Sequence, residues 1–127
     1  MYENLALLRT AHAMARHAGN RQAVVARNLA NADTPGYRAQ AIAPFAETFD
    51  AAPAGAMRAT RPGHAASAPG FAAGDIDFSD AEPAPNGNSV SVELEMVHAA
   101  NVEREHDRAL SVYRHTLTVL RSVINGR

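Results

Sequence analysis

Two Glu-x-x-His motifs give this sequence its clearest potential for metal chemistry. They are Glu95–His98 and Glu103–His106, and this spacing places a carboxylate and an imidazole on one face of a helix. Di-iron bundles draw such motifs from two different helices and add two further carboxylates. Here both motifs lie in one segment, and the N-terminal segment offers only Glu3. We therefore expect no metal site, and a helical metal-binding protein is the alternative from another functional class.

Other site chemistry has less support. The sequence has no Cys, which excludes thiolate ligands, disulfides and a cysteine nucleophile. It contains neither a G-x-S-x-G motif nor a glycine-rich phosphate loop. His64 lies in an Ala/Pro/Gly-rich stretch and is expected to be solvated. We predict that the protein is not an enzyme, with no catalytic residues and no cofactor.

The charge pattern argues against nucleic acid and membranes as partners. The formal net charge is −1, so no overall field favours a polyanion. Arg9, Arg16, Arg21 and Arg27 make the first segment basic, but a solvated arginine face explains them, since lysines and interleaved aromatic residues are missing. No stretch approaches the roughly 18 apolar residues that span a bilayer, and the run 5–8 is too short for a signal peptide.

Prolines divide the chain into three segments. All seven prolines and six of the eight glycines lie between residues 33 and 88. Because a proline costs about 3 kcal/mol inside a helix, the two flanks are predicted to be helical and the middle irregular. We expect an all-α protein with an N-terminal helix in 1–32, a turn and partly disordered middle in 33–90, and a C-terminal helix in 91–127.

Both flanks carry apolar stripes with a seven-residue repeat, the signature of a coiled coil. Alanine is frequent in the stripes and permits close helix packing, whereas large anchors are scarce and Trp is absent. The seam positions that we single out are Leu8, Val25, Met96, Leu110, Tyr113, Leu117, Leu120 and Ile124. Neither helix can bury such a stripe adequately alone, which predicts assembly with neighbours.

Several short sequence motifs predict local structure in the rest of the chain. Residues 34–37 read Thr-Pro-Gly-Tyr and predict a type II turn, with proline and glycine at its central positions. Pro44 suits the first turn of a short helix, and residues 75–78 alternate like an edge strand. Residues 51–74 are expected to be poorly ordered, and Ser91 is a favourable N-cap for the last helix.

The run from Asn28 to Tyr37 resembles the N-terminal signature of flagellar rod, hook and hook-associated proteins. That family carries a pattern like A-N-N-[IL]-A-N-x-x-T-P-G-[YF] at the end of its first helix, and Arg27 departs from it mildly. We assign these residues to the assembly and turn motif: Asn28, Leu29, Asn31, Asp33, Thr34, Pro35, Gly36 and Tyr37.

Residues 87–96 are similar to the opening of the C-terminal helix in the FlgB subgroup of this family. The segment 33–88 is also too short for the β-domains that hook and distal-rod relatives insert. The FlgC subgroup, which is close in size, is the alternative within the family.

The resemblance implies a structural subunit of the proximal rod in the bacterial flagellar basal body. Its terminal helices would pair as a coiled coil, stack helically around the export channel and transmit torque. The implied partners are further copies of the chain, FlgC- and FlgF-type subunits, the adaptor FliE, the MS-ring protein and the flagellar type III export apparatus. The implied location is the periplasmic rod, reached without a cleaved signal peptide.

Overall fold

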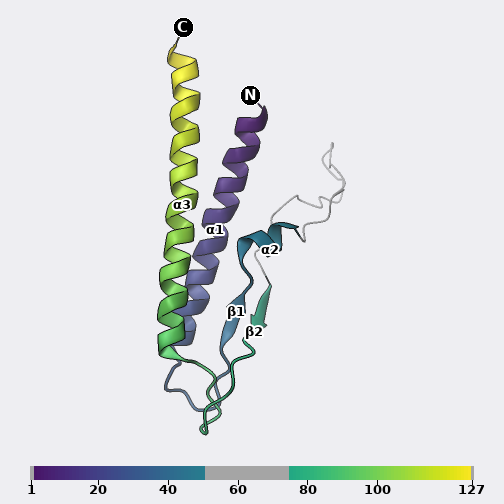
Figure 1. Ribbon diagram of the computed structural model, residues 1–127, viewed down its shortest axis with the longest axis vertical. Helices are drawn as coiled ribbons and strands as arrows, with labels where there is room; N and C mark the ends of the chain where they lie inside the picture. The colour runs from purple at the N-terminus through teal and green to yellow at the C-terminus, as the bar shows by residue number, and fades with distance from the viewer. Residues whose placement is uncertain (1, 51–74, 127) are drawn as a thin grey trace, which may run out of the picture.

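A pair of long antiparallel helices dominates the computed structural model, which describes residues 2–50 and 75–126 (Figure 1). Both chain ends lie at one end of this pair, and the loops lie at the other. The predicted disorder of 51–74 and the environment of His64 concern residues outside the described ones. None of the helices in the described ranges is long and apolar enough to cross a membrane.

The two long helices begin and end within about two residues of the predicted N-terminal and C-terminal helical segments. Helix α1 spans Tyr2–Ala30 and helix α3 spans Val92–Asn125. Ser91 is the N-cap of α3, and its hydroxyl accepts a hydrogen bond from the Leu94 N–H at 3.4 Å. Backbone and Ser91 hydrogen bonds to the Glu93 carboxylate lower the pKa of that group. The expected cap is confirmed.

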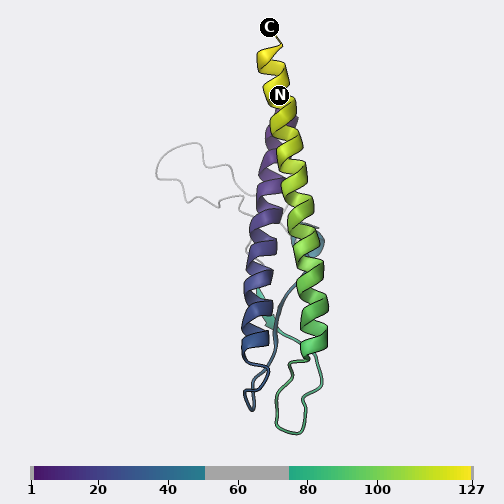
Figure 2. The same cartoon turned by 90° about the vertical axis from the view of Figure 1, so that its left-hand side faces the viewer.

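Helices α1 and α3 pack side by side along most of their length, as both views show (Figures 1 and 2). The buried contacts are made by small residues of α1, such as Ala11 and Ala18, against Val102 and Ala109 of α3. Small side chains let the helix axes approach closely, so the core between them is thin. Helix α3 also extends beyond the start of α1 (Figure 1), which leaves its last turn without a helix beside it.

The buried residues of α3 each come one position before a residue of a seven-residue repeat that includes the predicted seam positions Met96, Leu110 and Leu117. These buried positions are Glu95, Val102, Ala109 and Thr116, again at a seven-residue repeat. The sequence pattern followed the bulky apolar residues at 96, 110 and 117, whereas the closest approach is made where side chains are small. The repeat length was therefore recognised, but not the residues in this intramolecular interface.

A two-stranded sheet and a short helix lie along one side of the pair. Strand β1 (Gln40–Ile42) pairs antiparallel with β2 (Ile76–Phe78), with Ala41 opposite Asp77. Helix α2 (Phe45–Asp50) follows Pro44, whose carbonyl accepts the Glu47 and Thr48 N–H groups. The expected strand and short helix are confirmed. Strand β1 was missed because its three residues carry no alternation. The fold is mostly helical, with two long terminal helices, and is consistent with the predicted all-α class.

Much apolar surface remains uncovered in the single chain. Among the fully buried side chains that are described, the largest are Val102 and Asn28. By contrast, several large apolar side chains are more than half exposed: Leu94, Met96, Val97, Val123, Ile124, Ile76 and Phe78. Exposed apolar area on this scale marks surfaces that meet other molecules.

Candidate assembly site at the base of the helix pair

Asn28 is the centre of a buried hydrogen-bond network in the last turn of α1. Its side chain is 1% exposed, and Nδ2 donates to the Gln40 carbonyl at 2.7 Å and to Glu95 Oε1 at 3.0 Å. Oδ1 accepts from the Gln40 N–H at 3.0 Å. Asn28 thus satisfies both backbone groups of Gln40, as a neighbouring strand would. It also joins α1, β1 and α3 at one point.

The chain reverses after α1 through the predicted type II turn, which is confirmed. The Tyr37 N–H donates to the Thr34 carbonyl at 3.3 Å, and Gly36 has φ 73°. Tyr37 turns back toward the helix, because its hydroxyl lies 3.4 Å from Asn28 Oδ1. Asn31 Nδ2 donates to the Arg27 carbonyl at 2.8 Å and caps the helix end. These contacts fold the turn motif back onto the C-terminal end of α1.

A second turn, in residues 84–88, touches the first. The Gly87 N–H donates to the Ala84 carbonyl at 2.8 Å, and Gly87 has φ 78°. The Gly36 N–H donates to the Asn86 carbonyl at 3.0 Å. A Cβ on Gly87 would lie 3.3 Å from the Gly36 Cα. Both glycines adopt the positive φ that favours glycine, and Gly87 also permits the close approach of the two turns.

Asn88 ties the second turn to the end of α1. It is 4% exposed, and its Nδ2 donates to three carbonyls, at 3.0 Å for Asn31, 2.7 Å for Ala32 and 2.9 Å for Thr34. Its Oδ1 accepts from the Val90 N–H at 2.7 Å. Helix ends leave carbonyls without partners, and Asn88 supplies donors for them from a distant part of the chain.

We expect Asn88→Ala to lower the free energy of unfolding by about 2 kcal/mol, because it removes the side-chain donor to the Ala32 carbonyl and the acceptor of the Val90 N–H. Urea unfolding of the purified chain, followed by far-ultraviolet circular dichroism, measures this. The matched control is Asn101→Ala on the exposed side of α3. Equal midpoints for the two variants would contradict the capping role of Asn88.

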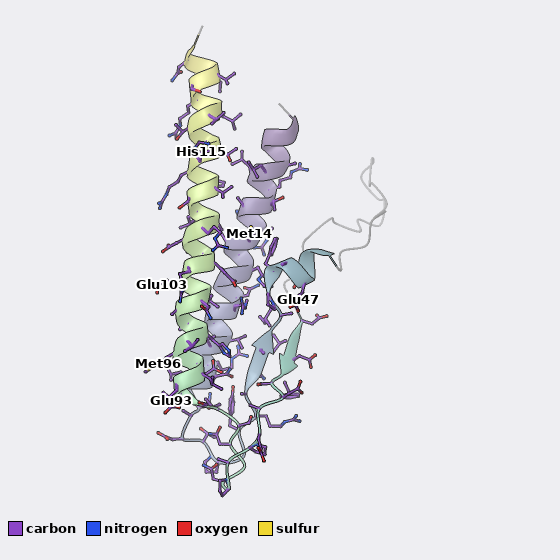
Figure 3. All side chains as sticks on the ribbon, in the orientation of Figure 1. Met14, Glu47, Glu93, Met96, Glu103 and His115 are labelled. Carbon is purple, nitrogen blue, oxygen red and sulfur yellow. The ribbon has the colours of Figure 1, made fainter. Side chains whose placement is uncertain are left out.

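The Glu-x-x-His motifs are split between the interior and the surface. Glu95 is 6% exposed and accepts from Asn28, while its Oε2 is buried without a hydrogen-bond partner. His98 is exposed, with Nδ1 3.9 Å from Glu95 Oε1. Glu103 is exposed and lies on the side of α3 that is turned away from α2 (Figure 3). Within the described residues, no group of three His, Cys, Asp or Glu side chains is placed to hold a metal ion.

His17 of α1 is buried and packs against α2. It is 3% exposed, its ring meets the edge of Phe45 at a centroid distance of 5.5 Å, and both ring nitrogens lack hydrogen-bond partners. The neighbouring Arg21 Nη1 and Glu105 Oε2 form an ion pair at 2.6 Å. Burial lowers the pKa of His17, the Arg21 charge lowers it further, and the Glu105 charge opposes both.

The lowered pKa predicts a pH dependence of stability. The unfolded chain binds a proton at His17 near the ordinary value of 6.5, whereas the folded chain resists it. Stability is therefore unaffected by this group above about pH 6.5 and falls as the pH drops from there toward the folded pKa. We expect His17→Phe to remove this part of the loss between neutral pH and about pH 5.5, as measured by urea unfolding. The exposed His115→Phe is the control and should leave the loss unchanged.

The residues of the predicted site fall into distinct environments. In the turn motif, Asn28 is buried, Asn31 and Tyr37 are half-buried, and the remaining members are exposed, with Leu29 43% exposed. Among the seam positions, Val25 is buried, while the half-buried ones are Leu8, Leu110, Leu117 and Leu120. Met96 and Ile124 are exposed to 61% and 73%, and Tyr113 to 36%.

The structure adds buried positions whose contacts the sequence analysis did not predict. Asn88 and Glu95 complete the network around Asn28, and His17 anchors α2. A usable signal existed for Asn88, since it follows an Asn-Gly turn directly before a helix cap. Nothing in the sequence marks Glu95 as buried, because it is surrounded by residues whose side chains are exposed.

Comparison with known proteins points to one family. Residues 9–38 match the family described as flagella basal body rod protein. The chain is 29% identical to the flagellar basal body rod protein FlgB of Cereibacter sphaeroides over 107 residues, which cover 84% of each chain. The family match begins in α1, includes Asn28 and ends just after the first turn. The family match therefore includes Asn28 and the first turn, whereas Gln40, Asn88 and Glu95 of the buried junction lie outside it.

Proposed function

We propose that the chain is a flagellar basal body rod protein of the FlgB type and that its copies build the proximal rod. One observation carries this assignment: the family match over residues 9–38 coincides with the end of α1 and its turn, where Asn28 is 1% exposed. The relative named FlgB extends the likeness to both helices, because it covers 84% of the chain.

Assembly by the terminal helices follows from what the single chain leaves uncovered. Helices α1 and α3 contact each other through alanine, valine and threonine, whereas Leu8, Leu117 and Leu120 are only half-buried. Neighbouring subunits would complete the burial of these side chains. We propose that α1 and α3 form a coiled-coil layer, stack helically around the export channel and transmit torque.

The buried junction at the base suits a part that bears load. Asn28 and Asn88 fix the end of α1 to β1, to α3 and to the second turn through hydrogen bonds in the interior. Because these bonds are shielded from water, a force on the subunit is resisted by several bonds together. The described parts of the three proposed segments, 1–32, 33–90 and 91–127, would then move as one unit.

The likeness to the rod family supports a location in the flagellar basal body, in association with other basal body components. Within this setting we propose contacts with further copies, FlgC- and FlgF-type subunits, FliE and the MS-ring protein. Delivery would be through the flagellar type III export apparatus, without cleavage, into the periplasmic rod. The role is structural rather than enzymatic.

The direct test is genetic and biochemical. We expect a strain without this gene to lose motility and to regain it when a tagged copy is supplied, with the tag recovered at the base of isolated rods. Basal bodies that are complete and functional without the chain would contradict the proposed function.

A further inference from the structure

Two asparagines of this chain are followed directly by glycine. They are Asn86, which precedes Gly87 in the second turn, and Asn125, which precedes Gly126 at the end of α3. The other six asparagines precede residues that carry a side chain. Because glycine has no Cβ, its backbone nitrogen is unshielded and can attack the amide of the asparagine before it. Both dipeptides can therefore modify themselves in water without an enzyme, which is one reason that asparagine is a thermolabile residue.

The reaction at Asn86 consumes water and releases ammonia. The Gly87 nitrogen bonds to Cγ of Asn86, the bond from Cγ to Nδ2 breaks, and the proton of the attacking nitrogen leaves with the ammonia. Water then opens the resulting succinimide ring at either of its carbonyl carbons. Opening at Cγ gives aspartate, whereas opening at the backbone carbonyl carbon gives isoaspartate, in which the main chain runs through the former side chain. Either product replaces a neutral amide by a carboxylate.

The fold restrains the groups that this reaction uses at Asn86. The Gly87 N–H, which must lose its proton, donates to the Ala84 carbonyl at 2.8 Å. The side-chain Oδ1 of Asn86 accepts from the Asn88 N–H at 3.0 Å, and its main-chain carbonyl accepts from the Gly36 N–H at 3.0 Å. Both Asn86 and Gly87 are exposed, so water reaches them freely. The restraint is therefore the hydrogen-bonded geometry, and the turn must open before Asn86 can react.

Opening this turn disturbs the whole junction between the two turns. Asn88 follows directly, is 4% exposed, and donates from Nδ2 to the Ala32 carbonyl at 2.7 Å. A Cβ on Gly87 would lie 3.3 Å from the Gly36 Cα, so the two turns are in close contact. The segment around Asn86 is thus attached to the end of α1, and its opening costs more than the opening of a free loop.

Asn125 carries the same reactive sequence without such a junction. It is the last residue of α3 and is exposed. It lies at the end of the helix pair where both chain ends are found, opposite the two turns (Figure 1). Helix ends open at little cost in free energy. Asn125 therefore serves as a comparison for Asn86 within one molecule.

We propose that Asn86 is a self-modification site that the junction keeps inactive, so that a folded chain retains the amide and a chain that stays unfolded loses it. Isoaspartate adds one methylene carbon to the main chain before Gly87 and displaces that glycine from its contact with Gly36. A chain modified while unfolded therefore closes the junction poorly. Chemical change of the unfolded state makes unfolding irreversible. This modification does not depend on the proposed rod function.

Mass spectrometry of the purified full chain tests the proposal, after incubation at mildly alkaline pH in water that carries heavy oxygen. Each conversion incorporates heavy oxygen, and fragment ions assign it to a residue. In urea, we expect Asn86 and Asn125 to convert at similar rates. In buffer, Asn86 should convert at least about tenfold more slowly than in urea, because the reaction follows the population of the open form. Asn125 should be slowed less.

Asn88→Ala tests whether the junction is the source of the protection. This variant removes the side-chain bonds to the end of α1 and should raise the rate at Asn86 in buffer at least about threefold, with the rate at Asn125 unchanged. The control Asn101→Ala, on the exposed side of α3, should change neither rate. An equal rise at Asn86 and Asn125 would show that the whole chain opens and would reject the role of the junction.

Return to buffer after a long incubation in urea tests the structural consequence. We expect the converted chain to unfold at a lower urea concentration than a fresh one. Asn86→Asp, treated in the same way, is the matched control, because it carries the charge of the product and keeps an acceptor for the Asn88 N–H but does not lengthen the main chain. Asn125 is converted in both chains, so the difference between them reports on residue 86 alone.

Three results would overturn the proposal. The first is the absence of conversion at Asn86 in urea, and the second is an equal rate at Asn86 in buffer and in urea. The third is a converted chain that unfolds at the same urea concentration as the treated Asn86→Asp control.

Discussion

Replacing Leu120 with Asp is expected to abolish incorporation of the subunit into the rod. Leu120 is half-buried on α3 in the single chain, and its remaining surface is where we place a neighbouring subunit. An ionised carboxylate there would lose its water on assembly without gaining a partner, at an effective cost of several kcal/mol. Because the same penalty recurs in every copy, a few kcal/mol per contact suffices to prevent growth.

The measurement is the recovery of a tagged variant in isolated basal bodies, together with swimming in soft agar. Thr118→Asp is the matched control, because Thr118 lies two residues away on the same helix but is exposed. It should be incorporated. Normal swimming with Leu120→Asp would show that this side of α3 does not face another subunit.

Asn28→Ala should cause the largest loss of stability in the isolated chain, about 3 kcal/mol of unfolding free energy. The substitution removes both partners of the Gln40 backbone and the donor to Glu95 Oε1. The other carboxylate oxygen of Glu95 already lacks a partner, so the whole group would be buried and unpaired. Folded domains are stable by only about 5–15 kcal/mol, so this loss is a large fraction of the total.

Urea unfolding is again the measurement, with Asn20→Ala as control, since Asn20 is exposed on the same helix. Asn28→Asp provides a second reading, because it sets a carboxylate beside Glu95 and should also destabilise at neutral pH. A stable Asn28→Ala chain would show that the network is not important for folding.

The helices and turns of this protein were predictable because local chemistry determines them. Prolines confined to the middle excluded a long helix there, Ser91 capped α3, and Pro35 with Gly36 fixed the type II turn. Strand β1 was not predictable, since Gln40–Ile42 is held by the side chain of Asn28 and by its partner strand. Its conformation depends on tertiary contacts and leaves no pattern in the sequence.

The seam illustrates the same limit within a helix. A heptad repeat shows that one face is buried, but it does not reveal which of two adjacent faces meets the partner within the chain. Val102 and Ala109 were overlooked because they are small, and small residues allow the closest contact. The predicted seam instead contained bulky neighbours such as Met96, which are exposed in the single chain. Their contacts with other subunits stay a prediction.

The capping of α1 by Asn88 has a consequence for the order of folding. Asn88 lies 57 residues after Asn31, and Glu95 lies 67 residues after Asn28, so these bonds close long stretches of chain. Closing such a loop costs entropy before any bond compensates for it, which slows folding. A chain that emerges from its N-terminus onward cannot complete the lower end of α1 until residue 95 is free. The hydrogen bonds that fix the C-terminal end of α1 can therefore form only after the first residues of α3 are available.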